Sequence, residues 1–327
     1  MDQGGDQLLE LKFMAEDQGV NGDAWRREAT RLLEALGWRQ IGDGNVDIVD
    51  SNGKKPGIDV MFQYEDGYGT SRYPQGVFVE AKRYETTSLT KAELNRWVNN
   101  LAEKVLNLKN SPGLHEKYPD TKRLLLTAGL IVVWFHDTAN YPAFKKTLDS
   151  YLRAVKVPKG LTSKAVNIRV LLIDNERISR LASVADKIRK WEADNGPGSI
   201  EFFYSSSGLL GNSVGTLPTL NLEYMLSQFI FAKGRKASKN GVNTDIVFYF
   251  GDLSHQSFVR LSEALNLYGV LDKGNDLIIF KYRREDDDFR KHKADVLSLF
   301  ENKSSNSVEI RNMETFTDLP TWITDGE

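Results

Sequence analysis

Two short apolar runs that carry charged residues most constrain the fold of this chain. They span residues 56–62 and 76–84, are rich in Val, Ile and Phe, and are separated by a polar loop with glycines and a proline. This pattern predicts two paired β-strands. Because side chains two residues apart in a strand share a face, Glu80 and Lys82 lie on the same face. If Asp59 lies beside Glu80 across the ladder, two carboxylates and one ammonium converge.

Such a cluster of charges points to a particular chemistry. Two carboxylates that lie close together repel, and each resists ionising beside the other. A hard divalent cation removes the conflict, since Mg²⁺ prefers oxygen ligands and keeps several waters. A lysine at the rim then orients a water molecule or neutralises charge on a phosphate. Together these groups suit metal-assisted hydrolysis of a phosphodiester.

These residues also resemble a known family. The Gly-Ile-Asp strand start at 57–59, the hairpin and the Val-Glu-Ala-Lys sequence at 79–82 are similar to the PD-(D/E)XK nuclease superfamily, which has the restriction-endonuclease-like fold. The resemblance implies that Asp59 and Glu80 bind Mg²⁺, with Mn²⁺ as a substitute. It also implies that Ala81 lends its carbonyl to the metal and that Lys82 assists the attacking water.

The first helix supplies a fourth candidate. Related nucleases often carry a glutamate there that reaches toward the metal, and Glu28 is the candidate here, although the family position falls nearer Arg26. The alternative is that Glu28 is a solvated helix residue. Simpler interpretations also exist for the other three: Asp59 caps a turn, and Glu80 with Lys82 forms a cross-strand surface pair.

Composition sets outer limits on fold and function. A chain of 327 residues exceeds the usual size of a single domain, and 40% apolar residues suffice for a large core. The net charge of −2 neither selects nor excludes a nucleic-acid ligand, because a nuclease needs only a local basic surface. The absence of cysteine excludes disulfides, zinc–thiolate sites and thiol nucleophiles.

No targeting or membrane segment is predicted. The acidic start at residues 1–6 lacks the basic-then-apolar order of a signal peptide. The longest nearly apolar stretch, 124–135, is too short to span a membrane. We therefore expect a soluble cytoplasmic protein that has no membrane partner.

The order of elements predicts an α/β fold over residues 1–204. Strands that alternate with helices indicate a mixed sheet flanked by helices, here a restriction-endonuclease-like sheet that forms the nuclease domain. Aromatic and arginine side chains in the loop at 64–75 either clamp nucleic acid or pack the loop onto the sheet. Beyond the first two strands, the expected elements are helices at 23–36, 89–109 (capped by Thr90), 142–155 and 176–194, and strands at 46–50, 124–135, 167–174 and 199–204.

Residues 205–327 are expected to form a smaller α/β domain for dimerisation, partner docking or target recognition. The small residues at 205–213 lack the Gly-Lys-Ser/Thr ending of a phosphate-binding loop and indicate a linker. The basic segment 233–239 either grips a phosphate backbone or is solvated. The expected elements are helices at 220–232, 255–268 and 288–300, and strands at 245–250, 276–282 and 307–312.

Taken together, the residues and the resemblance predict a Mg²⁺-dependent DNA endonuclease. DNA as the substrate follows from the family resemblance. By analogy we expect a role in bacterial defence against phage, as a homodimer or with a second defence-system subunit that gates the activity. Two alternatives remain: a non-catalytic nucleic-acid-binding or scaffold subunit that keeps the fold, and an RNA-cleaving toxin.

Overall fold

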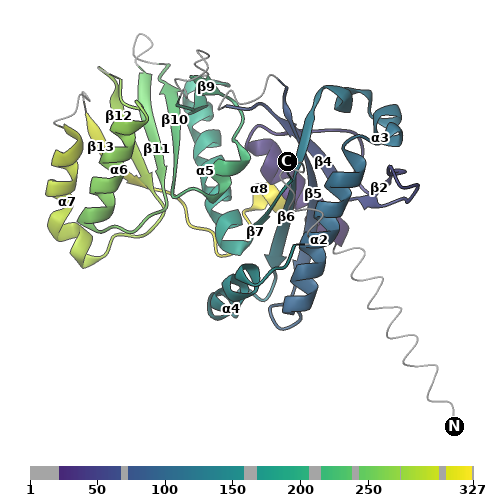
Figure 1. The fold of residues 1–327 in the computed structure, drawn as a ribbon. Coiled ribbons are helices and arrows are strands. Elements are labelled where there is room, and N and C mark those ends of the chain that lie inside the picture. The colour runs from purple at the N-terminus through teal and green to yellow at the C-terminus, as the bar shows by residue number, and fades with distance from the viewer. Residues whose placement is uncertain are drawn as a thin grey trace.

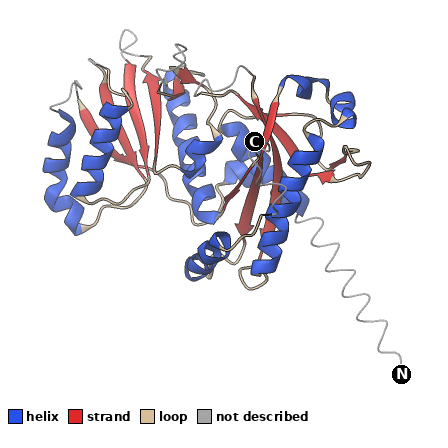
Figure 2. Cartoon of the chain, viewed as in Figure 1, coloured by secondary structure: helices blue, strands red, loops and turns tan. Residues whose placement is uncertain are grey.

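Two β-sheets and the helices around them make up the molecule (Figures 1 and 2). The computed structural model describes residues 22–67, 73–157, 168–205, 215–237, 243–272, 274–301 and 307–325. The first sheet has the strand order β1-β4-β5-β6-β7 and the second the order β13-β12-β11-β10-β8-β9, and β2 pairs with β3 beside the first sheet. The mixed α/β architecture predicted from the sequence is confirmed.

The first sheet combines antiparallel and parallel strands. β1, β4 and β5 are antiparallel neighbours, whereas β5, β6 and β7 run parallel. β6 lies inside the sheet between β5 and β7 and is almost entirely buried, as its continuous apolar sequence predicts for a strand covered on both faces. The strands are β1 (Arg39–Gln40), β4 (Val60–Tyr64), β5 (Gln75–Tyr84), β6 (Leu125–Phe135) and β7 (Arg169–Ile173), and the small pair is β2 (Val46–Asp47) with β3 (Gly57–Ile58).

Helices cover both faces of this sheet. A helix at 22–35 buries Trp25 and Leu32 on one face, and α2 (Lys91–Leu108) covers the other face with Leu94 and Leu101. Thr90 caps α2 as predicted, because its hydroxyl accepts a hydrogen bond from the backbone N–H of Glu93. The remaining elements around this sheet are α3 (Pro112–Lys117), the 3₁₀ helix η1 (Pro119–Arg123) and α4 (Tyr141–Arg153).

The second sheet has three parallel strands, β11 to β13, followed by antiparallel strands β10, β8 and β9. α6 (His255–Leu267) and α7 (Asp287–Glu301) pack on its outer face through a separate apolar cluster. The strands are β8 (Ile200–Phe203), β9 (Thr216–Leu217), β10 (Phe229–Arg235), β11 (Asn243–Tyr249), β12 (Asp276–Lys281) and β13 (Val308–Asn312).

Helix α5 (Asn175–Asn195) lies between the two sheets (Figure 1). Leu181 and Ala182 belong to one apolar cluster that contains strand residues of both sheets. A helix with apolar residues on two sides is buried on two sides, and α5 fits this rule. The two sheets therefore share a continuous core.

The short C-terminal helix α8 (Thr321–Thr324) packs beside the helix at 22–35, where Arg31 donates hydrogen bonds to the carbonyls of Ile323 and Thr324 at 2.5 and 2.9 Å.

Two sequence-based assignments around the second sheet are wrong. The expected helix at 220–232 is instead the 3₁₀ helix η3 (Leu222–Leu226) followed by β10. A short apolar run does not by itself separate helix from strand, and pairing of β10 with β8 and β11 on its two sides decides for the strand. The strand at 200–203, expected in the first sheet, joins the second through β10. The domain division at residue 204 stays a prediction.

The basic segment at 233–239 begins inside β10. The Lys233 ammonium lies 2.7 Å from a carboxylate oxygen of Asp245 and 2.7 Å from one of Asp272, so it is already paired within the fold. The last part of this segment, most of the linker at 205–213 and the tip of the loop at 64–75 lie outside the described residues.

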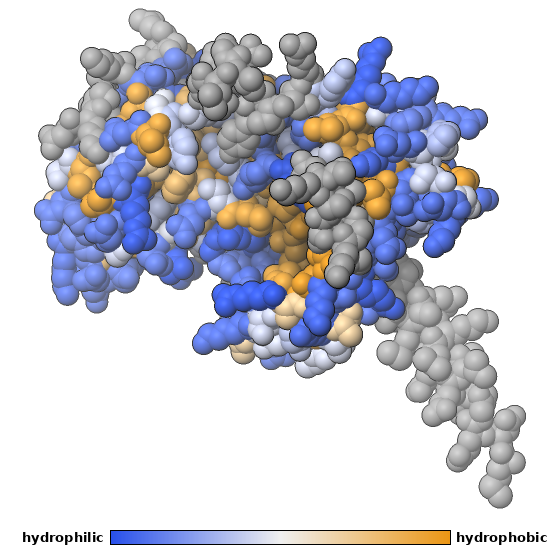
Figure 3. All heavy atoms as spheres, in the orientation of Figure 1, coloured by the Kyte–Doolittle hydropathy of each residue, from blue (hydrophilic) through white to orange (hydrophobic). Residues whose placement is uncertain are grey.

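The face of the molecule shown in Figure 3 is mostly hydrophilic, with hydrophobic surface near its centre and in further patches toward either side. In the described part of the chain, no helix combines the length and the apolar character that a membrane span requires.

Candidate active site

Asp59, Glu80 and Lys82 come together at the junction of β4 and β5. Val60 pairs with Val79 in the antiparallel ladder, so the preceding residue, Asp59, lies alongside Glu80. The Lys82 ammonium is 3.1 Å from Glu80 Oε2 and 3.8 Å from Asp59 Oδ2. The structure therefore brings together the two acids and the lysine that the sequence placed on one face.

The backbone fixes the first acid. The N–H of Ala81 donates a hydrogen bond to Asp59 Oδ2 at 3.1 Å, and the carbonyl of Asp59 accepts one from the N–H of Asn45 at 2.8 Å. Asp59 is held from both sides as the chain passes from β3 into β4. Its carboxylate consequently faces the same space as Glu80.

A second lysine, which sequence reasoning missed, completes the cluster. Lys104 of α2 places its ammonium 2.6 Å from Glu80 Oε1. The amino-acid sequence contains a pattern that could have identified this residue. Lys104 lies at helical spacing from Trp97 and Leu101 on the buried side of α2. A charged residue on an apolar stripe requires a partner, and Glu80 is that partner.

The two lysines control the protonation of Glu80, which is only 5% exposed. Burial raises the pKa of Glu80, but the charges of Lys82 and Lys104 and their hydrogen bonds outweigh burial and hold the pKa below its ordinary value. Burial lowers the pKa of Lys82, whereas Glu80 and Asp59 raise it, and the net result is a raised pKa. At neutral pH Glu80 is ionised and Lys82 is protonated.

The donor set fits a hard divalent cation. One ammonium contacts carboxylate oxygens of both Asp59 and Glu80, which shows that a single cation can be shared between them. The residues that the structure describes contain no cluster of three or more His, Cys, Asp or Glu side chains suited to a metal. The site thus offers two carboxylates and nearby backbone, and Mg²⁺ commonly fills the remaining positions with water.

Glu28 has different neighbours. Val79 packs in the core under the helix at 22–35, and Arg83, in step with Val79 along β5, faces the same way. Burial raises the pKa of Glu28, and Arg83 is the foremost of the arginines that partly offset this effect. Glu28 thus lies on the side of β5 opposite to Glu80, which faces α2. A role for Glu28 at the metal stays a prediction.

Arg26, near which the family position falls, lies close to the candidate active site. A methyl group built on Gly44 would lie 1.9 Å from Arg26 Nη1 and 2.7 Å from the carbonyl oxygen of Asp59. The Arg26 guanidinium therefore passes next to the backbone of the first acid. The helix at 22–35 thus places a cation beside the backbone of Asp59, and this arginine also pairs with Asp23 of the same helix at 3.2 Å.

Comparisons with known proteins bear on the half of the chain that holds this site. The family described as "GAPS4 protein PD-(D/E)XK nuclease domain" matches residues 14–177, which include Asp59, Glu80, Lys82 and Lys104. No curated protein matches the chain.

One solved structure, described as "Crystal structure of Aa-Ago with externally-bound siRNA", is 10% identical, covers 84% of this chain and 40% of its own, and has a TM-score of 0.20. A likeness that weak carries no argument. The family match covers half of the chain and all of the first sheet, which confirms the restriction-endonuclease-like fold. The chain belongs to the GAPS4 PD-(D/E)XK nuclease domain family.

Proposed function

We propose that this chain is a Mg²⁺-dependent endodeoxyribonuclease in which Mn²⁺ substitutes for Mg²⁺. The observation that carries the proposal is the shared contact of one ammonium with Asp59 and Glu80, on neighbouring strands of a nuclease-family domain. Together with the Ala81 carbonyl, these acids would hold the metal. When bound, such a cation stabilises charge on the phosphate and activates water.

The residues of the chain have defined tasks in this proposal. Glu80 and Asp59 outweigh burial and raise the pKa of Lys82, so its protonated ammonium donates hydrogen bonds. It orients the attacking water or stabilises charge on a non-bridging phosphate oxygen while the new P–O bond forms and the old one breaks. The Ala81 N–H keeps Asp59 directed at the same position, and Lys82 together with Lys104 lowers the pKa of Glu80 and so favours its ionised form.

A cleavage assay tests the substrate and the metal. The purified chain is offered supercoiled plasmid and labelled RNA with Mg²⁺, with Mn²⁺ and with a chelator. We expect plasmid cleavage with either metal, none with the chelator, and intact RNA. Cleavage of RNA alone would favour the toxin alternative. An inert chain, tested alone and with a partner subunit, would favour the scaffold alternative.

The biological setting is part of the proposal. A nuclease of this kind would injure its own cell unless it were gated, so we propose a role in defence against phage DNA in the cytoplasm, as a homodimer or with a second subunit. The C-terminal unit is then the place for dimerisation, partner docking or target recognition. The shared core around α5 supports this arrangement, because it ties that unit firmly to the nuclease sheet.

Removal of Lys104 is expected to strengthen metal binding. In the Lys104→Met variant, Glu80 Oε1 loses an ammonium at 2.6 Å that competes with a divalent cation. A unit charge at this range, partly screened by solvent, changes affinity by about tenfold. Titration calorimetry with Mn²⁺ measures the change, and exposed Lys91 on the same helix provides the control, Lys91→Met. Unchanged or weaker Mn²⁺ binding in Lys104→Met would contradict the competition.

A further inference from the structure

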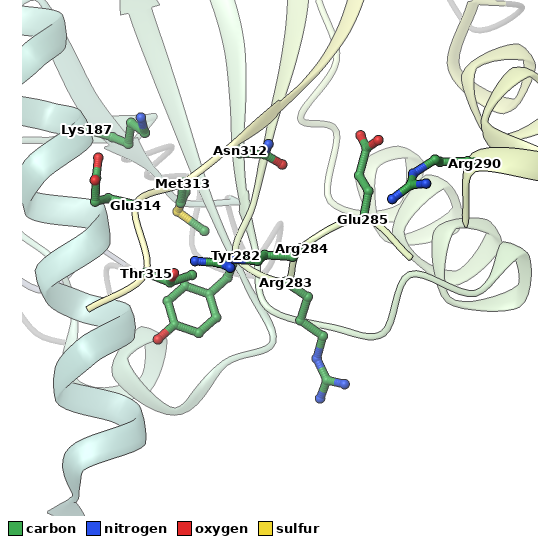
Figure 4. A pocket seen from close by; sticks show the side chains of 10 residues that line it. All are labelled: Lys187, Tyr282, Arg283, Arg284, Glu285, Arg290, Asn312, Met313, Glu314 and Thr315. Carbon is green, nitrogen blue, oxygen red and sulfur yellow. The ribbon is translucent and has the colours of Figure 1, made fainter. Parts of the chain in front are cut away.

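A second candidate binding site lies in the second sheet, at the carboxyl ends of β12 and β13. A pocket of about 520 Å³ lies there beside α5 (Figure 4). Tyr282, Arg283 and Arg284 follow β12, Asn312 ends β13, and both strands are parallel to β11. In open α/β sheets, ligands bind in the crevice outside the carboxyl ends of the strands. The pocket has that location, and its volume lies in the range of small-molecule sites.

Positive charge predominates in the lining. Both acids of the pocket are engaged by cations outside it: Glu285 pairs with Lys293 at 3.0 Å, and Glu314 pairs with Lys190 at 3.3 Å. Their charge is therefore largely neutralised. The charged residues of the lining are Lys187, Arg283, Arg284, Arg290, Glu285 and Glu314.

The four cations that line the pocket differ in whether they form an ion pair with a carboxylate. Arg283 pairs with Asp252 and Arg290 with Asp287, each at 2.8 Å. In the portion of the chain that the structure describes, neither Lys187 nor Arg284 forms an ion pair. Figure 4 shows Arg284 extending toward Tyr282 and Thr315, whereas Arg283 points away. The pocket thus holds two uncompensated positive charges, from α5 and from the segment after β12.

A neutral donor accompanies these charges. The Lys281 side chain is fully buried, and its ammonium donates to Asn312 Oδ1 and to the Arg283 carbonyl. An ammonium only donates, so it requires the amide oxygen of Asn312 on its own side. Since Asn312 also lines the pocket, its N–H₂ group is left to serve a ligand.

We propose that this pocket binds a phosphate group, supplied either by a free nucleotide or by a nucleic-acid backbone. A phosphate monoester carries a charge of about −1.5 to −2 and three strong acceptor oxygens, and a backbone phosphodiester carries a single negative charge shared by two such oxygens. Lys187, Arg284 and the Asn312 amide supply donors for either group. The planar guanidinium of Arg284 suits two phosphate oxygens at once. The proposal stands independently of the nuclease site, which lies in the other sheet.

Binding measurements on the full chain test this site. The Glu80→Gln chain serves as background, so that DNA probes stay intact and a failure of the proposed nuclease cannot be mistaken for a failure of the pocket. Inorganic phosphate, adenosine 5′-monophosphate and a short DNA duplex are titrated calorimetrically. We expect the double variant Lys187→Ala/Arg284→Ala to bind the recognised probe about tenfold more weakly or worse.

Lys291→Ala is the matched control, because Lys291 is an exposed cation on α7 directly after Arg290. It removes one charge without touching the pocket, and we expect unchanged binding. Loss confined to phosphate and the mononucleotide identifies a free ligand, and loss confined to the duplex identifies the backbone. The proposal is overturned if no probe binds, or if the double variant binds as well as the Lys291→Ala control. Thermal melting checks that each variant is folded.

Discussion

Replacement of Glu80 by glutamine is expected to reduce plasmid cleavage at least about a thousand-fold. The substitution removes the charge that one metal ligand contributes, and it leaves the ammonium groups of Lys82 and Lys104 near a neutral amide. Metal stabilisation of a phosphoryl transition state is worth several kcal/mol, and each 1.4 kcal/mol is about tenfold in rate. Initial rates of plasmid nicking with saturating Mg²⁺ measure the effect.

The control for Glu80→Gln is Glu103→Gln. Glu103 is an exposed acid on α2, next to Lys104 in sequence, and its replacement removes the same charge without touching the site. We expect Glu103→Gln to cleave at the native rate. A folded Glu80→Gln chain that keeps cleavage within tenfold of the native rate would remove Glu80 from the mechanism.

Replacement of Asp245 by alanine is expected to lower the free energy of unfolding by about 3–5 kcal/mol. The carboxylate is fully buried and accepts from the Lys233 ammonium at 2.7 Å, the Asn275 side chain at 2.9 Å and the Asp272 N–H at 3.0 Å. Without it, one buried and two partly buried donors lose an acceptor, and one of them is a charged group that keeps only Asp272 and the Val270 carbonyl. Urea denaturation followed by circular dichroism measures the loss.

Asp272→Ala removes the other, exposed carboxylate partner of Lys233. The Asp272 side chain is 63% exposed and also lies 2.7 Å from the Lys233 ammonium. Exposed ion pairs contribute about 0–1 kcal/mol, so this variant is expected to remain close to native stability. Equal losses in the two variants would show that burial does not distinguish the two partners of Lys233.

The three-residue cluster was predictable from sequence because its geometry is local. Glu80 and Lys82 share a face through the two-residue period of one strand, and Asp59 belongs to the strand that pairs with it directly. Because both strands bury apolar faces, a slip of one residue would turn these side chains to the wrong side, and the apolar pattern therefore sets the register. The apolar runs likewise predicted β6, α2 and the helix at 22–35, since burial on a constant face leaves a periodic trace.

Lys104, β10 and the phosphate pocket depend on contacts between distant parts of the chain. Lys104 meets Glu80 only after α2 packs on the sheet, and the run at 229–235 becomes a strand only because β8 and β11 pair with it. Arg284 and Asn312 become neighbours through the parallel alignment of β12 with β13. Local periodicity in the amino-acid sequence was therefore enough to indicate the acids and the lysine of the candidate active site. The pairing of distant segments became visible only in the folded chain, because short apolar runs and single charges acquire their partners through long-range packing.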